Sequence, residues 1–195
     1  MIRSSVDRRR LPAGERRLEI LAAAKPVFGA RGYHAATTRD IAAAAGVSEA
    51  LLYQHFSGKQ QLFEAVVEIC AAELEQRLCI SVMGADPLGQ TLTTYFGFVE
   101  EEADLYRIFF RQALQEQAFQ RLYHAYSSRL LELLLTALGA APGPRSDVLG
   151  HAVAGMVSEL ALWWVEEGGP SRQEIVGQAV SMARAMHASE AGHGR

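Results

Sequence analysis

The most constraining feature of this chain is the segment 37–55, which has the pattern of two short helices around a glycine turn. Thr37 with Asp40 three residues later is typical of a capping box, and Ser48 is a second helix cap. Gly46 lies between the two caps, and glycine tolerates the left-handed backbone that a tight turn requires. The segment therefore predicts a helix-turn-helix, whose second helix covers about two turns.

Small and apolar residues are placed to pack these two helices together: Ile41, Ala42, Ala45, Val47 and Leu52. The alanines allow a close approach, and a two-turn helix is long enough to enter the major groove of DNA. A plain helical hairpin is the alternative interpretation. Three capping signatures and a basic flank favour the helix-turn-helix.

Helical periodicity covers nearly all of the chain, whereas strand signals are almost absent. We expect a first helix over residues 13–31, bent by Pro26 and ended by Gly32. Residues 57–60 form the third capping signature, before a long helix over 59–81. Later helices are expected at about 86–102, 104–115, 117–138, 145–166 and 172–188, with a frayed tail from Ser189.

Charge is distributed unevenly along the chain, although its net charge is only −3. Residues 1–60 hold ten Lys/Arg against five Asp/Glu, whereas residues 61–195 hold nine against seventeen. A basic end on an acidic body is typical of proteins that face nucleic acid. We therefore predict an all-α protein with a three-helix DNA-binding domain over 1–60 and a helical bundle over 61–195. Arg8–Arg10 fit either a minor-groove arm or a loose tail.

Motifs for an enzyme, a metal site or a cofactor site are missing from the sequence. It contains no HExxH, P-loop, GxGxxG or GxSxG pattern, so we expect no enzyme activity, cofactor or metal. Cys70 and Cys79 have neither zinc nor redox spacing and are expected to be reduced and buried. Without a secretory signal or a run of ~18 apolar residues, the expected location is the cytoplasm.

The segment Leu18–Val67 resembles the DNA-binding domain of the tetracycline-repressor (TetR) family. Mild departures are Pro26 inside the first helix and the negative Glu49 on the second short helix. The resemblance implies a transcription regulator, a repressor released from a palindromic operator by a small apolar molecule, that binds as a homodimer. The resemblance rests on residues 20–24, Phe28, Gly32-Tyr33, Thr37-Thr38, Ile41-Ala42, residues 45–48, Leu52-Tyr53, His55-Phe56 and Lys59.

The candidate DNA-binding residues have side chains suited to phosphates or to base edges. Lys59 begins the long helix, where free backbone N–H groups add to a phosphate site. Gln54 can pair with adenine and Glu49 with cytosine, although a solvated surface role is the alternative for both. The full predicted set is Thr37, Thr38, Arg39, Ser48, Glu49, Ala50, Leu51, Tyr53, Gln54, His55 and Lys59.

The second domain is rich in aromatic residues, which at helical spacing form either a core or the wall of a cavity. The resemblance implies a ligand cavity, for which we predict Tyr95, Phe109, Tyr123, Tyr126, Met156 and Trp163. Possible polar groups in it are Gln112, His124 and His151.

Two stripes on the last two helices indicate an oligomer interface, because small residues allow close approach and methionine adapts to a partner. The resemblance implies a two-fold four-helix bundle there. The predicted interface residues are Ala152, Gly155, Glu159, Ile175, Ala179, Met182 and Met186. A nucleoid structural protein without an effector is the remaining alternative to a regulator.

Overall fold

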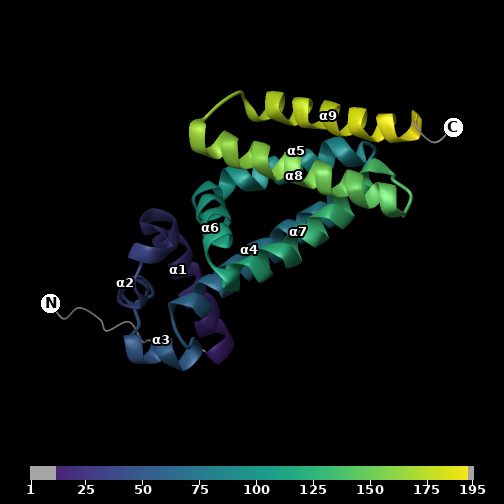
Figure 1. Ribbon diagram of the computed structural model, residues 1–195. Coiled ribbons are helices and arrows are strands. Elements are labelled where there is room, and N and C mark those ends of the chain that lie inside the picture. The colour runs from purple at the N-terminus through teal and green to yellow at the C-terminus, as the bar shows by residue number, and fades with distance from the viewer. Residues whose placement is uncertain (1–11, 193–195) are drawn as a thin grey trace. The chain divides into compact units, whose positions relative to one another are not determined.

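The computed structural model describes residues 12–192, except the side chains at 113–115, 118 and 190–192. Within this range the chain forms nine helices and no strand, which confirms the all-α prediction (Figure 1). The chain divides into two compact units: unit 1 ends at Val66, and unit 2 begins at Val67. This division lies a little beyond the boundary at residue 60 that the sequence suggests.

Unit 1 is built from α1 (Ala13–Ala35), α2 (Thr38–Ala44), α3 (Glu49–His55) and the first turns of α4 (Lys59–Ser81). Gly32 takes φ 74° and ψ 166° inside α1, so the predicted stop at this glycine is a break followed by a last short turn. Pro26 lies within α1 without moving the backbone out of the helical region.

Aromatic packing gives unit 1 its core and explains where the unit ends. The ring of Phe63 in α4 meets Phe28 edge-on at 5.1 Å between centroids and lies 5.0 Å from Tyr33. Ile41 of α2 and Leu52 of α3 are fully buried. Since Phe63 packs with rings of α1, the start of α4 belongs to unit 1.

The N-terminus of α4 differs in one detail from the predicted capping signature at residues 57–60. The side chain of Gln61, not Gln60, returns to accept a hydrogen bond from the Ser57 backbone N–H at 2.6 Å. Gln60 instead donates to Glu64 one turn along the helix at 2.9 Å. The helix still begins at Lys59 as expected.

Unit 2 contains the rest of α4 and five further helices, of which α9 extends beyond the expected fraying at Ser189. In this unit α9 packs on α5 and α8, while α7 packs on α6 and α8. The helices are α5 Pro87–Glu101, α6 Ala103–Gln115, α7 Gln117–Leu138, α8 Pro144–Glu167 and α9 Arg172–Gly192.

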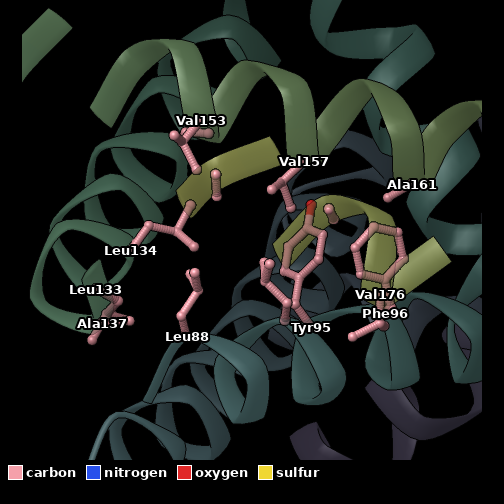
Figure 2. Close-up of a cluster of buried hydrophobic side chains, with 14 of the residues drawn as sticks. Leu88, Tyr95, Phe96, Leu133, Leu134, Ala137, Val153, Val157, Ala161 and Val176 are labelled. Carbon is pink, nitrogen blue, oxygen red and sulfur yellow. The ribbon is translucent and has the colours of Figure 1, made fainter. Parts of the chain in front are cut away.

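The core of unit 2 joins α5, α7, α8 and α9 (Figure 2). Phe96 of α5, Leu134 of α7 and Val157 of α8 are fully buried in it. Burying such side chains stabilises the fold by about 1.5–3 kcal/mol each. By length and composition α8 could also cross a membrane, yet its residues Val153, Val157 and Ala161 lie in this core.

Candidate DNA-binding face and ligand cavity

Side-chain caps set the geometry of the helix-turn-helix, as the sequence predicts. Thr37 Oγ1 accepts a hydrogen bond from the Asp40 backbone N–H at 3.1 Å, and Asp40 accepts from the Thr37 hydroxyl at 2.7 Å. Arg31 lies 2.7 Å from the same carboxylate. The Thr37 hydrogen bond and the Arg31 charge lower the pKa of Asp40, although partial desolvation opposes them. The carboxylate therefore stays ionised and holds the start of α2.

The turn and the second helix follow the same local rules. Gly46 has φ 66°, the left-handed conformation that the prediction requires. Ser48 caps α3 by accepting from the Leu51 backbone N–H at 3.1 Å. Ile41, Ala42 and Leu52 are buried between the helices, which leaves the opposite face of α3 free to meet a partner.

The predicted DNA-binding residues belong to α2, α3, their caps and the start of α4, and they differ in exposure. Tyr53 is 51% exposed, so its side chain is not part of the buried core of unit 1. Its hydroxyl lies 3.1 Å from that of Thr38, which links α3 to α2. Besides Tyr53, exposed positions are Thr37, Arg39, Ser48, Ala50 and Gln54, and half-buried positions are Thr38, Glu49, Leu51, His55 and Lys59.

Lys59 is more engaged than a free phosphate-binding lysine. Its Nζ donates to the His34 backbone carbonyl at 3.0 Å and lies 4.7 Å from the centroid of the Tyr33 ring. The ammonium therefore stabilises the end of α1 through a hydrogen bond and a cation–π contact. An ammonium has three donors, so this bond leaves capacity for a phosphate oxygen.

Arg17 of α1 makes a contact with the end of α3 that the sequence did not predict. Its NH1 donates to the His55 backbone carbonyl at 2.9 Å, and its guanidinium lies 4.2 Å from the centroid of the Phe56 ring. Arg17 thus satisfies a carbonyl at the end of α3 and anchors that end to α1. No local pattern reveals this contact, because the two partners are 38 residues apart.

Unit 2 contains a cavity of about 110 Å³, lined by residues of α4, α5, α6, α7 and α8. Four of the six predicted ligand residues line it: Tyr95, Phe109, Tyr123 and Tyr126. Tyr106 and Phe110 of α6, which the prediction omitted, also line it, and their rings lie 4.4 Å apart. The aromatic stripe in this region therefore forms both a core and a cavity wall.

Two buried tyrosines provide polar atoms in this wall. The hydroxyl of Tyr95 lies 2.7 Å from that of Tyr106, which donates to the Ser158 backbone carbonyl at 3.2 Å. Burial raises the pKa of both phenols, and most strongly that of Tyr106. Both rings are therefore neutral hydrogen-bonding groups at neutral pH.

Met156 and Trp163 are predicted ligand residues that do not line this cavity. Met156 packs against the hydrophobic core, and Trp163 is 44% exposed. The Trp163 ring covers Gly169, where an added Cβ would lie 3.1 Å from it. Of the possible polar groups, His124 and His151 are exposed, and the buried Gln112 does not line the cavity.

Family models match segments of both units of the chain. Residues 20–66 match "Bacterial regulatory proteins, tetR family", and residues 85–186 match "Tetracyclin repressor-like, C-terminal domain". The second match alone covers more than half of the chain. The protein belongs to the TetR family.

Two curated relatives of this TetR-family protein are named as regulators of transcription. The activator FasR of Mycolicibacterium smegmatis is 41% identical over 52% of this chain and 48% of its own length. The repressor Rv3405c of Mycobacterium tuberculosis is 38% identical over 46% of this chain and 48% of its own. The chain thus spans about half the length of the curated relatives it matches.

A solved TetR-family regulator from Streptomyces coelicolor shares the fold, with a TM-score of 0.82 at 23% identity. The likeness covers 94% of this chain and 85% of that one. The fold similarity therefore includes both units of this TetR-family protein, beyond the segment that carries the sequence similarity.

The predicted dimer residues of the TetR-family protein fall into two groups. Ile175 and Ala179 are a wrong prediction, because they are 2% and 0% exposed and pack in the core of their own unit. Met186 is half-buried against the same core. The positions that remain exposed are Ala152, Gly155, Glu159 and Met182.

Among residues 12–192 no three His, Cys, Asp or Glu side chains gather as a metal site. Cys70 is buried and Cys79 is half-buried. The candidate sites are the apolar cavity of unit 2 and the polar side chains around α2 and α3.

Proposed function

We propose that this TetR-family protein is a ligand-responsive repressor that binds a palindromic operator as a homodimer in the cytoplasm. The observation that carries the proposal is the capped helix-turn-helix with exposed side chains along α3. Phosphate contacts position such a helix, and contacts with base edges give it specificity. In this proposal Thr38, Tyr53 and Lys59 bind phosphates, while Gln54 and Glu49 read bases with Ala50 and Leu51 beside them.

Selection of bound sequences from a random DNA pool tests this proposal. A two-fold dimer presents its two α3 helices to half-sites one or more turns apart, ~34–36 Å for one turn. We therefore expect an inverted repeat. Recovery of unrelated sequences, with diffuse coating of any DNA, would instead support the nucleoid structural protein.

Two variants separate positioning from reading. Lys59→Ala is expected to weaken binding to all DNA sequences alike. It should also reduce by about one unit the slope of log K against log[salt], where K is the association constant for DNA. Gln54→Ala is expected to lose ~1–3 kcal/mol of discrimination at one base pair and to keep the salt slope. Unchanged base preferences in Gln54→Ala would remove the reading role.

The dimer interface in this proposal is the outer face of α8 with Met182 of α9. Only 33% of the most apolar window of α8 is buried inside the chain. Val148 is 70% exposed on the same helix, and Gly155 permits close approach of a second helix. Apolar surface of this kind is typical of a face that meets a partner.

Light scattering on Met182→Glu tests this interface. A carboxylate buried without a partner is costly, so we expect a monomer with unchanged helicity. Ser181→Glu is the control for charge on the exposed part of α9, because Ser181 is exposed about 100° around the helix from Met182. If the Met182→Glu variant remains a dimer, the interface lies elsewhere on the protein.

The effector in this proposal is a small, largely apolar molecule that occupies the cavity of unit 2 and releases the operator. The helix α4 contributes Val67, Cys70, Ala71 and Leu74 to the cavity, and its first turns belong to unit 1. A coupling free energy of only ~1–3 kcal/mol changes operator affinity ~5–150-fold, and the coupling is reciprocal. Operator DNA is therefore expected to weaken ligand binding by the same factor, which a titration with and without operator measures.

A further inference from the structure

The polar groups of the unit 2 cavity define which ligand charge it can accept. Its walls are mostly aromatic and aliphatic, and α6 and α7 place the rings of Phe110 and Tyr123 edge-to-face at 5.3 Å. Every lining residue belongs to unit 2, and none is Lys, Arg or His. Hydroxyl groups and the carboxylate of Glu102 are the polar side-chain groups of this lining.

The hydroxyl groups of Tyr95 and Tyr106 have one hydrogen each to donate, which fixes what they can accept from a ligand. The Tyr106 hydroxyl donates its single hydrogen to the Ser158 carbonyl, so the hydrogen between the two phenols comes from Tyr95. The lone pairs of Tyr95 then remain available as acceptors. A hydroxyl or N–H of a ligand can donate to them, whereas a carboxylate, which only accepts, cannot.

The charges around the cavity also oppose an anion. Burial, followed by the carboxylates of Glu68 and Glu75, raises the pKa of Tyr126 to about 12. Arg129 lies 2.7 Å from Glu75 and partly offsets that charge, while Glu68 is exposed on α4. An anion in this cavity would lose its water without gaining a cationic partner, which is strongly unfavourable.

We propose that the cavity of unit 2 binds a small neutral molecule with a ring-shaped apolar body and one hydrogen-bond donor, in preference to organic acids. The inference deepens the proposed ligand response and rests on it. The cavity of about 110 Å³ is smaller than the ~150 Å³ cavity that holds benzene, so it limits the apolar body of a ligand to about one ring, with a substituent on the side where the cavity is partly open.

Calorimetric titration of the full chain without DNA tests the charge preference. Benzyl alcohol, benzoate and benzylammonium share one ring and one carbon arm and are neutral, anionic and cationic at pH 7. We expect benzyl alcohol to bind at least about tenfold more tightly than benzoate, and benzylammonium, which can also donate to Tyr95, to bind more tightly than benzoate as well. Binding of benzoate that is as strong as that of benzyl alcohol overturns the preference against organic acids and leaves the proposed ligand response standing.

Two variants place the binding at this cavity. Ala71→Phe fills space beside the rings and is expected to abolish binding of all three compounds. Tyr95→Phe removes the acceptor and keeps the ring. It is therefore expected to reduce the affinity for benzyl alcohol severalfold, while toluene binds as in the unchanged protein. Equal loss of toluene and benzyl alcohol in Tyr95→Phe would overturn the hydrogen-bonding role.

Operator binding separates this inference from the proposed function. If no compound binds the unchanged protein, both the inference and the cavity as the effector site are wrong. If benzyl alcohol binds as expected but leaves operator affinity unchanged, the inference about the cavity holds and the proposed release mechanism fails.

Discussion

In unit 1 the candidate site is a set of exposed polar side chains held by local caps, whereas in unit 2 it is an apolar interior built by five helices. Thr37, Asp40 and Ser48 set the start of α2 and α3 through bonds that span three residues. The cavity of unit 2 instead depends on rings from separate helices, such as Tyr95 and Tyr106. The helix starts around the reading face are therefore determined locally, while the cavity depends on how whole helices pack.

The largest expected effect comes from truncating one buried ring in each unit. Phe28 and Phe96 are both 0% exposed, so replacing either by alanine is expected to cost ~3–5 kcal/mol of unfolding free energy. Phe28→Ala should destabilise unit 1 and weaken operator binding while benzyl alcohol still binds. Phe96→Ala should destabilise unit 2, so that the protein no longer dimerises and no longer binds benzyl alcohol.

Thermal unfolding followed by circular dichroism, together with calorimetric titration, measures both variants. A single unfolding transition whose midpoint temperature falls equally in both variants, with ligand binding lost in each, would show that the two units do not unfold separately. That result would contradict the distinction between the two units.

Arg17 is the exception to local control in unit 1, and its removal is expected to have the next largest effect. Arg17→Ala loses the bond to the His55 carbonyl and the contact with Phe56. Since hydrogen bonds to charged groups contribute ~1.5–3 kcal/mol, we expect operator affinity to fall about tenfold or more. Binding assays on the selected operator measure it.

A control for Arg17→Ala is Arg172→Ala, which breaks an exposed ion pair with Glu100 at 2.8 Å in unit 2. Exposed pairs contribute ~0–1 kcal/mol, so operator affinity should hardly change. Equal losses in the two variants would remove the positioning role of Arg17.

Matched helix caps give a smaller and sharper test of the comparison. Ser171 with Glu174 at the start of α9 has the same reciprocal pattern as Thr37 with Asp40, and the Glu174 carboxylate accepts from the Ser171 backbone N–H at 2.8 Å. Thr37→Ala and Ser171→Ala are each expected to cost ~1 kcal/mol of stability. Only Thr37→Ala should also weaken operator binding, as chemical denaturation and binding assays together would reveal.

The smallest effect is a dependence of stability on acid pH through the same two caps. Hydrogen bonds from Thr37 and Ser171 lower the pKa of Asp40 and of Glu174 in the folded protein. A depressed carboxyl pKa stabilises the fold above the unfolded-state value of ~4 and loses this contribution as pH falls through the folded value. Asp40→Asn and Glu174→Gln should each reduce the loss of melting temperature between pH 5 and about pH 2, and an unchanged acid profile would contradict the assignment.

Sequence alone determined the parts of this protein that are set over three or four residues. The caps at Thr37 and Ser48 and the glycine turn at Gly46 all form as predicted, because each depends on groups that are neighbours along the chain. The same short-range rules predicted the all-α class and the starts of the later helices.

Tertiary structure alone decided which way the helices of unit 2 face. Apolar residues occur on more than one side of α8 and α9, so periodicity could not tell the inner Ile175 and Ala179 from the outer Met182, nor exclude Trp163 from the cavity. The contact between Arg17 and His55 likewise joins residues 38 apart. A helix with several apolar faces takes its rotation from its neighbours, and those neighbours exist only in the folded chain.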